Sequence, residues 1–358
     1  MAHALDMTNG RANMAYVGET PWHGLGTVLP QGANLETWTQ AAGLNWEALK
    51  VPSFYPMKDE NGEEVMRQSR DDFHILRSDT YESLGVMTGR YQPVQPKDVM
   101  GFFEHFIEAD ERFTLETAGS LKAGKVIWAL AKFREQLDCA GDAHVPYVLL
   151  TTSYNGSLAT TAQATMIRVV CNNTLTASIF DKGAATVKVP HSRVWTPAVM
   201  ADAHERLATV ADSFGVYQSL ANALRNVKMA KDQTEAFLTK LLLKSDPTAD
   251  QGDGKVSGKA KAQLDALFAS WAKTATETEG NTGWAALNAV TRFADHERNT
   301  RRTNASISVA DARMASSFYG SGAALKATAV QMLAERGGID LETLGKAAHA
   351  KGSALVPA

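Results

Sequence analysis

The spacing of apolar residues changes about halfway along the chain, from short β-prone runs to long helical stretches. Between 50 and 180, the apolar runs are short and separated by Asp, Ser, Asn and Gly, as in strands joined by turns. Two pairs of runs, within 113–133 and 145–175, each flank a turn, the second containing Asn155-Gly156. The segment 96–110 carries an apolar stripe at helical spacing. This pattern predicts a curved antiparallel β-sheet with a helix packed across it, an α+β architecture.

The second half of the chain is predicted to be helical. Apolar residues recur every three or four positions from Leu207 to Val227, which predicts a long amphipathic helix of about six turns. A shorter helix is predicted over 232–244. The C-terminal helical region contains three further helical stretches, at 259–276, 282–298 and 309–335.

Turn-forming residues suggest where the chain divides. Residues 1–34 are rich in Gly, Asn and Pro, which indicates an extended arm, and a short helix is predicted from Leu35. Between 64 and 94 we expect three short strands of a meander. We therefore expect an arm and short helix over 1–50, an α+β core with the long helix over 51–245, a flexible linker over 246–260, a helical region over 261–340 and a tail over 341–358.

Composition narrows the class of protein. The 358 residues are 44% hydrophobic and 21% charged, which is typical of a folded chain of about two domains. The net charge of -3 argues against a protein that coats nucleic acid through a bulk positive field, but it permits a local basic patch. With two cysteines, no apolar signal segment and no run long enough to span a membrane, we expect a protein of a reducing cytoplasm.

No motif of a known enzyme class is present. The chain contains no Walker A loop, GxSxG, HExxH or GxGxxG motif, and its nine histidines lack metal-ligand spacing. We therefore expect no catalytic residues, no metal and no cofactor. An undescribed enzyme stays open as an alternative if His23, Arg168 or His191 meets a carboxylate in a deep pocket.

Basic and aromatic residues of the β-rich half are candidates for binding nucleic acid, because cations hold phosphates and aromatic rings stack on bases. The candidates are Lys122, Lys125, Tyr154, Arg168, Lys182, Lys188 and Arg193. Lysines in turns, such as Lys122 and Lys125, often have no role beyond exposure to solvent. An arginine within a β-branched run, such as Arg168, can pair with a carboxylate as well as with a phosphate.

Two further basic clusters lie in the helical half. Arg225, Lys228 and Lys231 form a stripe near a helix C-terminus, where the helix dipole favours positive charge. The second cluster consists of Arg292, Arg298, Arg301 and Arg302. It suits phosphate or an acidic surface of a neighbouring subunit equally well.

Three separated blocks resemble one known family. MAYVGETPWHGLG near the start, RVVCNNTL at 168–175, and GWAALNAVTRFADHER followed by SSFYGSGAALK resemble the phage/plasmid-like proteins grouped as domain of unknown function 932. The order of elements is also similar, more distantly, to the β-β-β-α core of single-strand annealing proteins. That resemblance implies a basic groove around a ring-shaped oligomer and carries no residue-by-residue assignment.

Two functions follow as hypotheses. The first is an accessory protein of a phage or plasmid that binds single-stranded DNA and promotes annealing in recombination. It would be a homo-oligomer held together by the long helix and the C-terminal helices. The alternative is a non-enzymatic factor that modulates a host or phage protein through the arm around Trp22 and the C-terminal helices.

Overall fold

The computed structural model consists of two compact units. Unit 1 comprises Met1–Arg134, Val148–Gln163 and Thr186–Arg206, and unit 2 comprises Glu135–Tyr147, Ala164–Ala185 and Leu207–Ala358. The structure describes residues 5–8, 10–18, 20, 24–109, 111–168, 174–176, 186–194, 196–208, 210–245, 257–277, 280–298, 313, 316–317 and 320–344.

The largest sheet has nine strands, in the order β13-β12-β11-β9-β8-β3-β4, with β10 paired to β11 and β14 to β12. Their bounds are β3 (Met14–Tyr16), β4 (Thr27–Val28), β8 (Phe113–Leu121), β9 (Val126–Phe133), β10 (Leu137–Cys139), β11 (Asp142–Ser153), β12 (Thr160–Arg168), β13 (Thr174–Thr176) and β14 (Thr186–Val189). The short β3–β4 pair is parallel, whereas β3–β8, β8–β9, β12–β13 and β12–β14 are antiparallel. Two short strands, β1 (Met7–Thr8) and β2 (Arg11–Ala12), form a separate pair.

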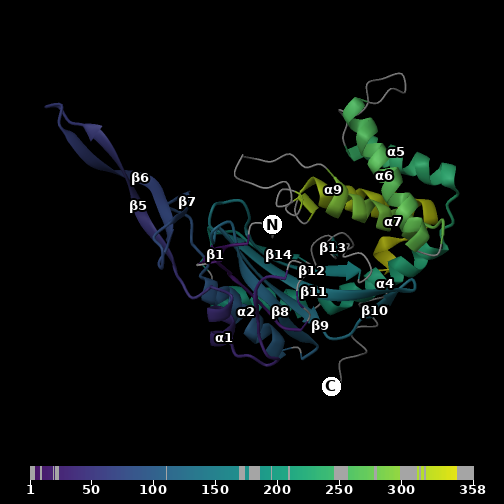
Figure 1. Ribbon diagram of the computed structural model, residues 1–358, viewed down its shortest axis with the longest axis horizontal. Coiled ribbons are helices and arrows are strands. Elements are labelled where there is room, and N and C mark those ends of the chain that lie inside the picture. Colours follow the sequence, from purple (N-terminus) through teal and green to yellow (C-terminus); the bar gives the residue numbers. More distant parts are fainter. Residues whose placement is uncertain are drawn as a thin grey trace. The chain divides into compact units, whose positions relative to one another are not determined.

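Helix α2 (Pro96–Ala109) packs across β8 and β9 (Figure 1). Its apolar stripe buries Phe102, Phe103 and Phe106. The ring of Phe106 lies 4.9 Å from that of Phe113 on β8, which lies 5.1 Å from Phe133 on β9. A short helix, α1 (Leu35–Ala41), packs against α2. The aromatic stripe of α2 therefore builds the core of unit 1.

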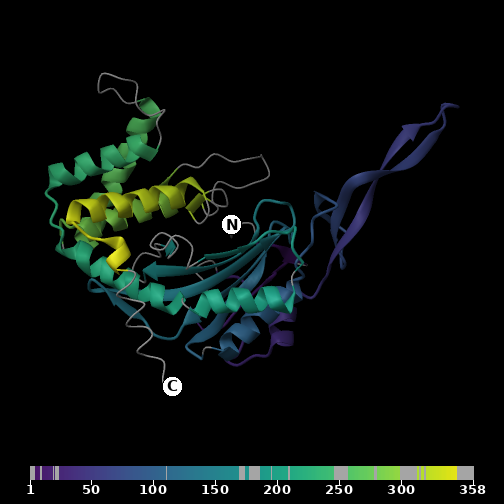
Figure 2. The same ribbon diagram turned by 180° about the vertical axis from the view of Figure 1, so that it is seen from behind.

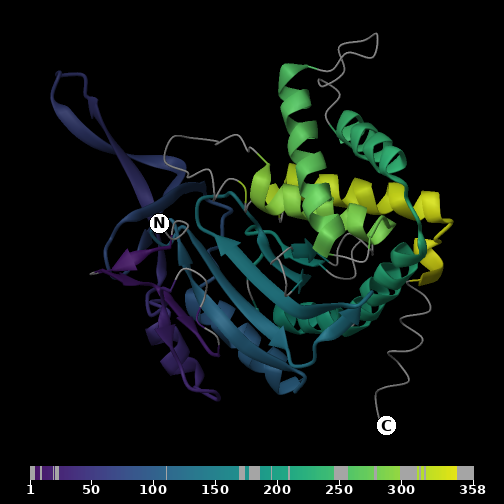
Figure 3. The same ribbon diagram turned by 45° about the vertical axis from the view of Figure 1, so that its right-hand side comes forward.

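A second sheet of unit 1 forms a long two-stranded ribbon. Strands β5 (Ala48–Lys58) and β6 (Glu64–Arg77) pair along their length, and β7 (Ser83–Thr88) adds to β6 only between Asp72 and Leu76. The ribbon extends away from β7 as two paired strands (Figures 1 and 3). Pro52 and Pro56 lie in β5, which is an edge strand and therefore tolerates residues that lack an N–H donor.

Unit 2 is mainly a bundle of helices (Figure 2). They are α4 (Val210–Asn226), α5 (Lys231–Ser245), α6 (Gly258–Glu277), α7 (Gly283–Arg292), the π-helix η3 (Phe293–Glu297) and α9 (Ser321–Gly337), while α3 (Pro197–Ala208) precedes α4. Helix α7 contacts α4, α6 and α9. Inside the bundle, the ammonium of Lys326 lies 2.9 Å from both Asp295 Oδ1 and Ser317 Oγ, and Ser317 donates to the same carboxylate.

The α+β class, the helix over 96–110 and the hairpin of 113–133 are confirmed. Of the three short strands predicted between 64 and 94, the first two are wrong as separate strands, because both fall in β6. The expected linker falls largely on 246–256 and the tail from 345, which lie outside the described residues. No helix in the described part of the chain is long and apolar enough to cross a bilayer.

The apolar stripe of the long helix packs inside unit 2. Phe214, Tyr217, Leu220 and Leu224 on α4 are buried, and α4 contacts α7. This face is therefore already covered within unit 2. The expectation that the long helix holds copies of the chain together stays a prediction.

Candidate nucleic-acid interface

Three connections meet at one end of the large sheet in unit 1. The N–H of Tyr154, after β11, donates to the carbonyl of Lys125, just before β9, at 2.9 Å. The first residue of β12, Thr160, is paired with Val189, the last residue of β14. His191 Nε2 lies 3.1 Å from the carbonyl of Leu158 in the β11–β12 connection. The β8–β9 turn, the β11–β12 turn and the chain after β14 are therefore neighbours.

Cations lie on these connections or next to them, and we call them the basic rim: Arg90, Lys122, Lys125, Lys188 and Arg193. Arg90 belongs with the others because the N–H of Gln92, two residues later, donates to the carbonyl of His191 at 2.6 Å. Arg90, Lys188 and Arg193 are exposed, whereas Lys122 and Lys125 are half-buried. No carboxylate of the described residues lies within ion-pair distance of a rim cation. The rim is therefore a patch of positive charge that a phosphate chain can neutralise.

The β8–β9 turn has a backbone conformation that side-chain-bearing residues rarely adopt. Lys122 and Ala123 both have φ of 56°, and Gly124 has φ of 85°. A Cβ added to Gly124 would lie 2.8 Å from Nη1 of Arg77, so only glycine fits there. The side chain of Arg77 therefore packs against this turn at Gly124. This contact fixes the backbone that carries Lys122 and Lys125.

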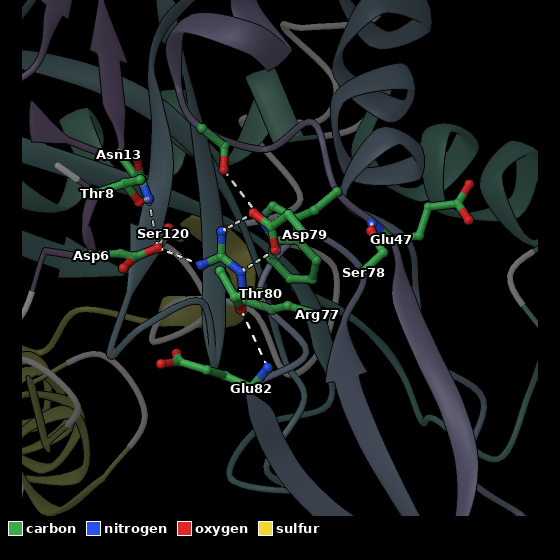
Figure 4. Close-up of polar contacts among 12 residues, drawn as sticks. Asp6, Thr8, Asn13, Glu47, Arg77, Ser78, Asp79, Thr80, Glu82 and Ser120 are labelled. Carbon is green, nitrogen blue, oxygen red and sulfur yellow. Dashed lines mark hydrogen bonds and ion pairs between the residues drawn. The ribbon is translucent and has the colours of Figure 1, made fainter.

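Arg77 is itself held by a buried network (Figure 4). Its guanidinium donates to Asp6 Oδ2 at 2.6 Å and to both carboxylate oxygens of Asp79 at 2.8 and 2.9 Å. It also lies 4.7 Å above the ring of Trp46. The carboxylate of Asp6 accepts further hydrogen bonds from Asn13 at 2.7 Å and from Ser120 at 3.1 Å. The network joins the N-terminal segment, β6 and β8 beneath the rim.

The pKa shifts in this network favour the charged forms of Arg77 and Asp79. Burial alone lowers the pKa of Arg77, but the hydrogen bonds and attraction of Asp79 and Asp6 outweigh it, and the net shift is upward. The hydrogen bond from Arg77 lowers the pKa of Asp79. Arg77 is therefore permanently charged, and its charge is neutralised by carboxylates of the protein. The rim cations, in contrast, have no carboxylate partner among the described residues.

The most exposed aromatic ring of this region is Tyr81, which is 71% exposed. It lies in the β6–β7 turn, with a φ of 57°, and its N–H donates to the carbonyl of Arg77 at 2.9 Å. Arg77 thus supports two displayed elements, the Tyr81 turn and the Lys122–Lys125 turn. Proteins that bind single-stranded nucleic acid combine exposed aromatic rings, which stack on bases, with cations, and here both are carried by turns that contact Arg77.

Tyr154, expected to stack on a base at the hairpin turn, instead belongs to the core. Its side chain is fully buried, its hydroxyl donates to the carbonyl of Val94 at 2.8 Å, and its ring meets Trp46 edge-on at 5.4 Å. Burial raises the pKa of Tyr154. Since no face of its ring is open, we leave Tyr154 out of the candidate site.

His191 is a packing residue of the same end. Its ring stacks on Tyr91 at 4.6 Å, and its described polar neighbours are the carbonyls of Gln92 and Leu158 and the hydroxyl of Thr152. Burial lowers the pKa of His191. Among the described residues, no group of three or more His, Cys, Asp or Glu side chains is placed to hold a metal ion.

The remaining predicted residues are placed only in part. Arg168 ends β12, but its side chain lies outside the described residues, as do Lys182 and His23. In the helical half, Arg292 pairs with Glu297 at 3.1 Å, and Lys231 pairs with Glu235 at 3.9 Å. Two of those cations thus face carboxylates of their own unit.

Comparison with known families identifies the chain. The profile of the family described as domain of unknown function 932 matches residues 83–315, more than half of the chain. The chain belongs to this family. It matches no curated protein and no solved structure significantly.

The domain of unknown function 932 contains the whole basic rim, since Arg90 to Arg193 lies within 83–315. The match begins after Tyr81 and after the β5–β6 ribbon. Arg77 and Tyr81, which shape the site, are therefore contributed by the part of this chain that precedes the match.

Sequence reasoning missed Tyr81 and Arg90. The signal for Tyr81 was an aromatic residue among turn-forming neighbours in SDTYES, and Arg90 stands in the similar context TGRYQP. Both lie in turns, where binding residues are often found.

Proposed function

We propose that this chain binds single-stranded DNA without cutting or joining it, as an accessory protein of a phage or plasmid. The basic rim contacts the phosphates, and Tyr81 stacks on a base. The observation that carries the proposal is the juxtaposition of cations without described carboxylate partners and an exposed aromatic ring, both supported by Arg77.

Single strands are preferred over duplex because only unpaired bases offer a face to Tyr81. Stacking of a base on an aromatic ring contributes about 1–3 kcal/mol, whereas phosphate contacts are similar for both forms. If all five rim cations contact phosphate, the slope of log K against log salt is about −3 to −4 for a single strand. A duplex contacts the same cations but forgoes the stacking contribution.

Annealing follows from the same geometry. A strand held by its phosphates along the rim, with one base stacked, keeps its other bases available for pairing with a complementary strand. The chemistry requires neither a nucleophile nor a metal, so the proposed role is non-enzymatic.

The test is a fluorescence-anisotropy titration of labelled single-stranded and duplex oligonucleotides at two salt concentrations. We expect tighter, salt-sensitive binding of the single strand, and faster pairing of two complementary labelled strands when the protein is added. Lack of single-strand binding at low salt contradicts the proposal. Equal affinity for both forms contradicts the role of Tyr81.

A second function, contact with another protein, is favoured by one specific observation. The ribbon β5–β6 exposes large apolar side chains, which monomeric proteins seldom present together. The charges and the exposed apolar side chains of the ribbon and of the rim indicate which partner this is.

A further inference from the structure

We infer that the ribbon of one copy of this chain docks on the basic rim of a second copy. The contact joins an acidic, apolar tip to a basic surface, so copies associate head to tail. This inference uses the same rim as the proposed function but does not depend on DNA binding.

The outer half of the ribbon exposes apolar side chains on both faces. Phe54, Tyr55, Met57 and Met66 are exposed by 54, 51, 42 and 61%. Pairing of Pro56 with Met66 and of Phe54 with Gln68 places Phe54 and Met66 on one face. Pairing of Tyr55 with Arg67 and of Met57 with Val65 places the other two on the opposite face. Isolated two-stranded ribbons are marginally stable in water, so this part of the ribbon gains most from being covered.

The end of the ribbon is acidic, and we call Glu60, Glu63 and Glu64 the ribbon tip. All three are exposed, and none has an ion-pair partner among the described residues. The neighbouring Asp59 is used locally, since its carboxylate accepts from the N–H groups of Asn61 and Glu63 at 2.9 Å. The tip therefore presents three free carboxylates on a turn that is already well formed.

The basic rim is the complementary surface. It offers five cations without a described carboxylate partner, and the exposed apolar side chain of Val194 follows Arg193 directly, while the exposed Tyr81 lies on the neighbouring turn supported by Arg77. The acidic tip argues against DNA as the occupant of the ribbon, because carboxylates repel phosphates. The charge of the tip fits the charge of the rim, and the exposed apolar residues give both surfaces area to bury.

The geometry directs the tip to another copy. The root of β6 is Arg77, which lies directly under the rim at Gly124. Strand β5 runs from Ala48, paired with Arg77, to Lys58, paired with Glu64, in 10 residue steps, so the tip lies roughly 33 Å from the root at about 3.3 Å per residue. The paired ribbon extends away from β7, so the tip lies away from the rim of its own chain (Figures 1 and 3). Pro52 and Pro56 remove donors from the edge of β5, so we place the contact on the faces and tip, not on sheet extension.

The experiment is sedimentation of the full chain without nucleic acid, using two charge-reversal variants. The first reverses the tip with Glu60→Lys, Glu63→Lys and Glu64→Lys, and the second reverses the rim with Lys122→Glu and Lys125→Glu. We expect the natural chain to associate in a concentration- and salt-dependent manner, and each variant alone to sediment as a monomer. Mixing the two variants is expected to restore association, since each reversed surface then meets an opposite charge.

Restoration by mixing also shows that both variants are folded. A natural chain that stays monomeric at every concentration overturns the inference and assigns the ribbon to a different protein. Association that survives either reversal, or that mixing fails to restore, overturns it as well.

The two proposals fail separately. The tip variant is expected to keep the single-strand affinity of a dilute natural chain, because its rim is intact. Loss of DNA binding with intact assembly contradicts only the proposed function, and the reverse result contradicts only the head-to-tail contact.

Discussion

Units 1 and 2 each bury a positively charged side chain, but they hold it in different ways. Arg77 in unit 1 has two carboxylate partners and an aromatic ring, and it supports two displayed turns. Lys326 in unit 2 donates to the carboxylate of Asp295 and to the hydroxyl of Ser317. The fork of an arginine binds several groups in fixed directions, whereas an ammonium is a point charge. The arginine lies where one side chain has to fix two surface turns, the Tyr81 turn and the Lys122–Lys125 turn.

Disrupting the Arg77 network gives the largest expected effect. Arg77→Met leaves Asp6 buried without its cation, which costs about 3–5 kcal/mol in the free energy of unfolding. Lys326→Met is expected to cost less, because Arg77→Met also removes the hydrogen bonds to Asp79 and the contact with the ring of Trp46. Urea denaturation of the two variants measures the difference.

Arg77→Lys is the matched control, since it keeps the charge but loses the fork. We expect it to recover only a minor part of the lost stability. Full recovery shows that charge alone suffices and removes the basis of the comparison.

An intermediate effect is expected at Tyr81. Tyr81→Ala removes the stacking face and weakens single-strand binding by about 1–3 kcal/mol, while duplex binding stays nearly unchanged. Tyr81→Phe keeps the ring and is expected to bind like the natural chain. Anisotropy titrations measure both, and equal losses for the two variants would assign the effect to the hydroxyl.

The smallest effect is a pH dependence of the lysine network in the alkaline range. Burial lowers the pKa of Lys326 below its usual 10.5, so between the two values the unfolded chain binds more protons than the folded chain. The contribution of Lys326 to stability therefore rises with pH across that window and is complete above about 10.5. Unfolding experiments across this range test the sign, with Lys326→Met as the variant expected to lack the rise.

The fold could be predicted from the sequence where one face of an element is buried. The apolar residues of α2 recur every three or four positions because one face of the helix lies on the sheet. The bounds of this helix were predicted correctly. Strand β6 was split in two because its outer half has neither face buried and so lacks an alternating pattern.

The candidate site was predicted in part. Lys122, Lys125, Lys188 and Arg193 lie at one end of the sheet, but Tyr154 turned inward because its turn packs on Trp46. The ion pair between Arg77 and Asp6 joins residues that are 71 positions apart. A local sequence pattern cannot predict such a pair. Local periodicity predicts elements, whereas the partners of a buried charge depend on tertiary contacts.

The most direct test of the nucleic-acid interface is the salt dependence of single-strand affinity after Lys122→Ala and Lys125→Ala together. Each phosphate contact contributes about 0.7 to the slope of log K against log salt, so the double variant is predicted to lose roughly 1.4. Lys259→Ala with Lys261→Ala is the control, because it removes the same charge from exposed positions of α6. A reduced slope in the rim variant alone supports the interface. Equal slopes in the natural chain, the rim variant and the control would contradict it.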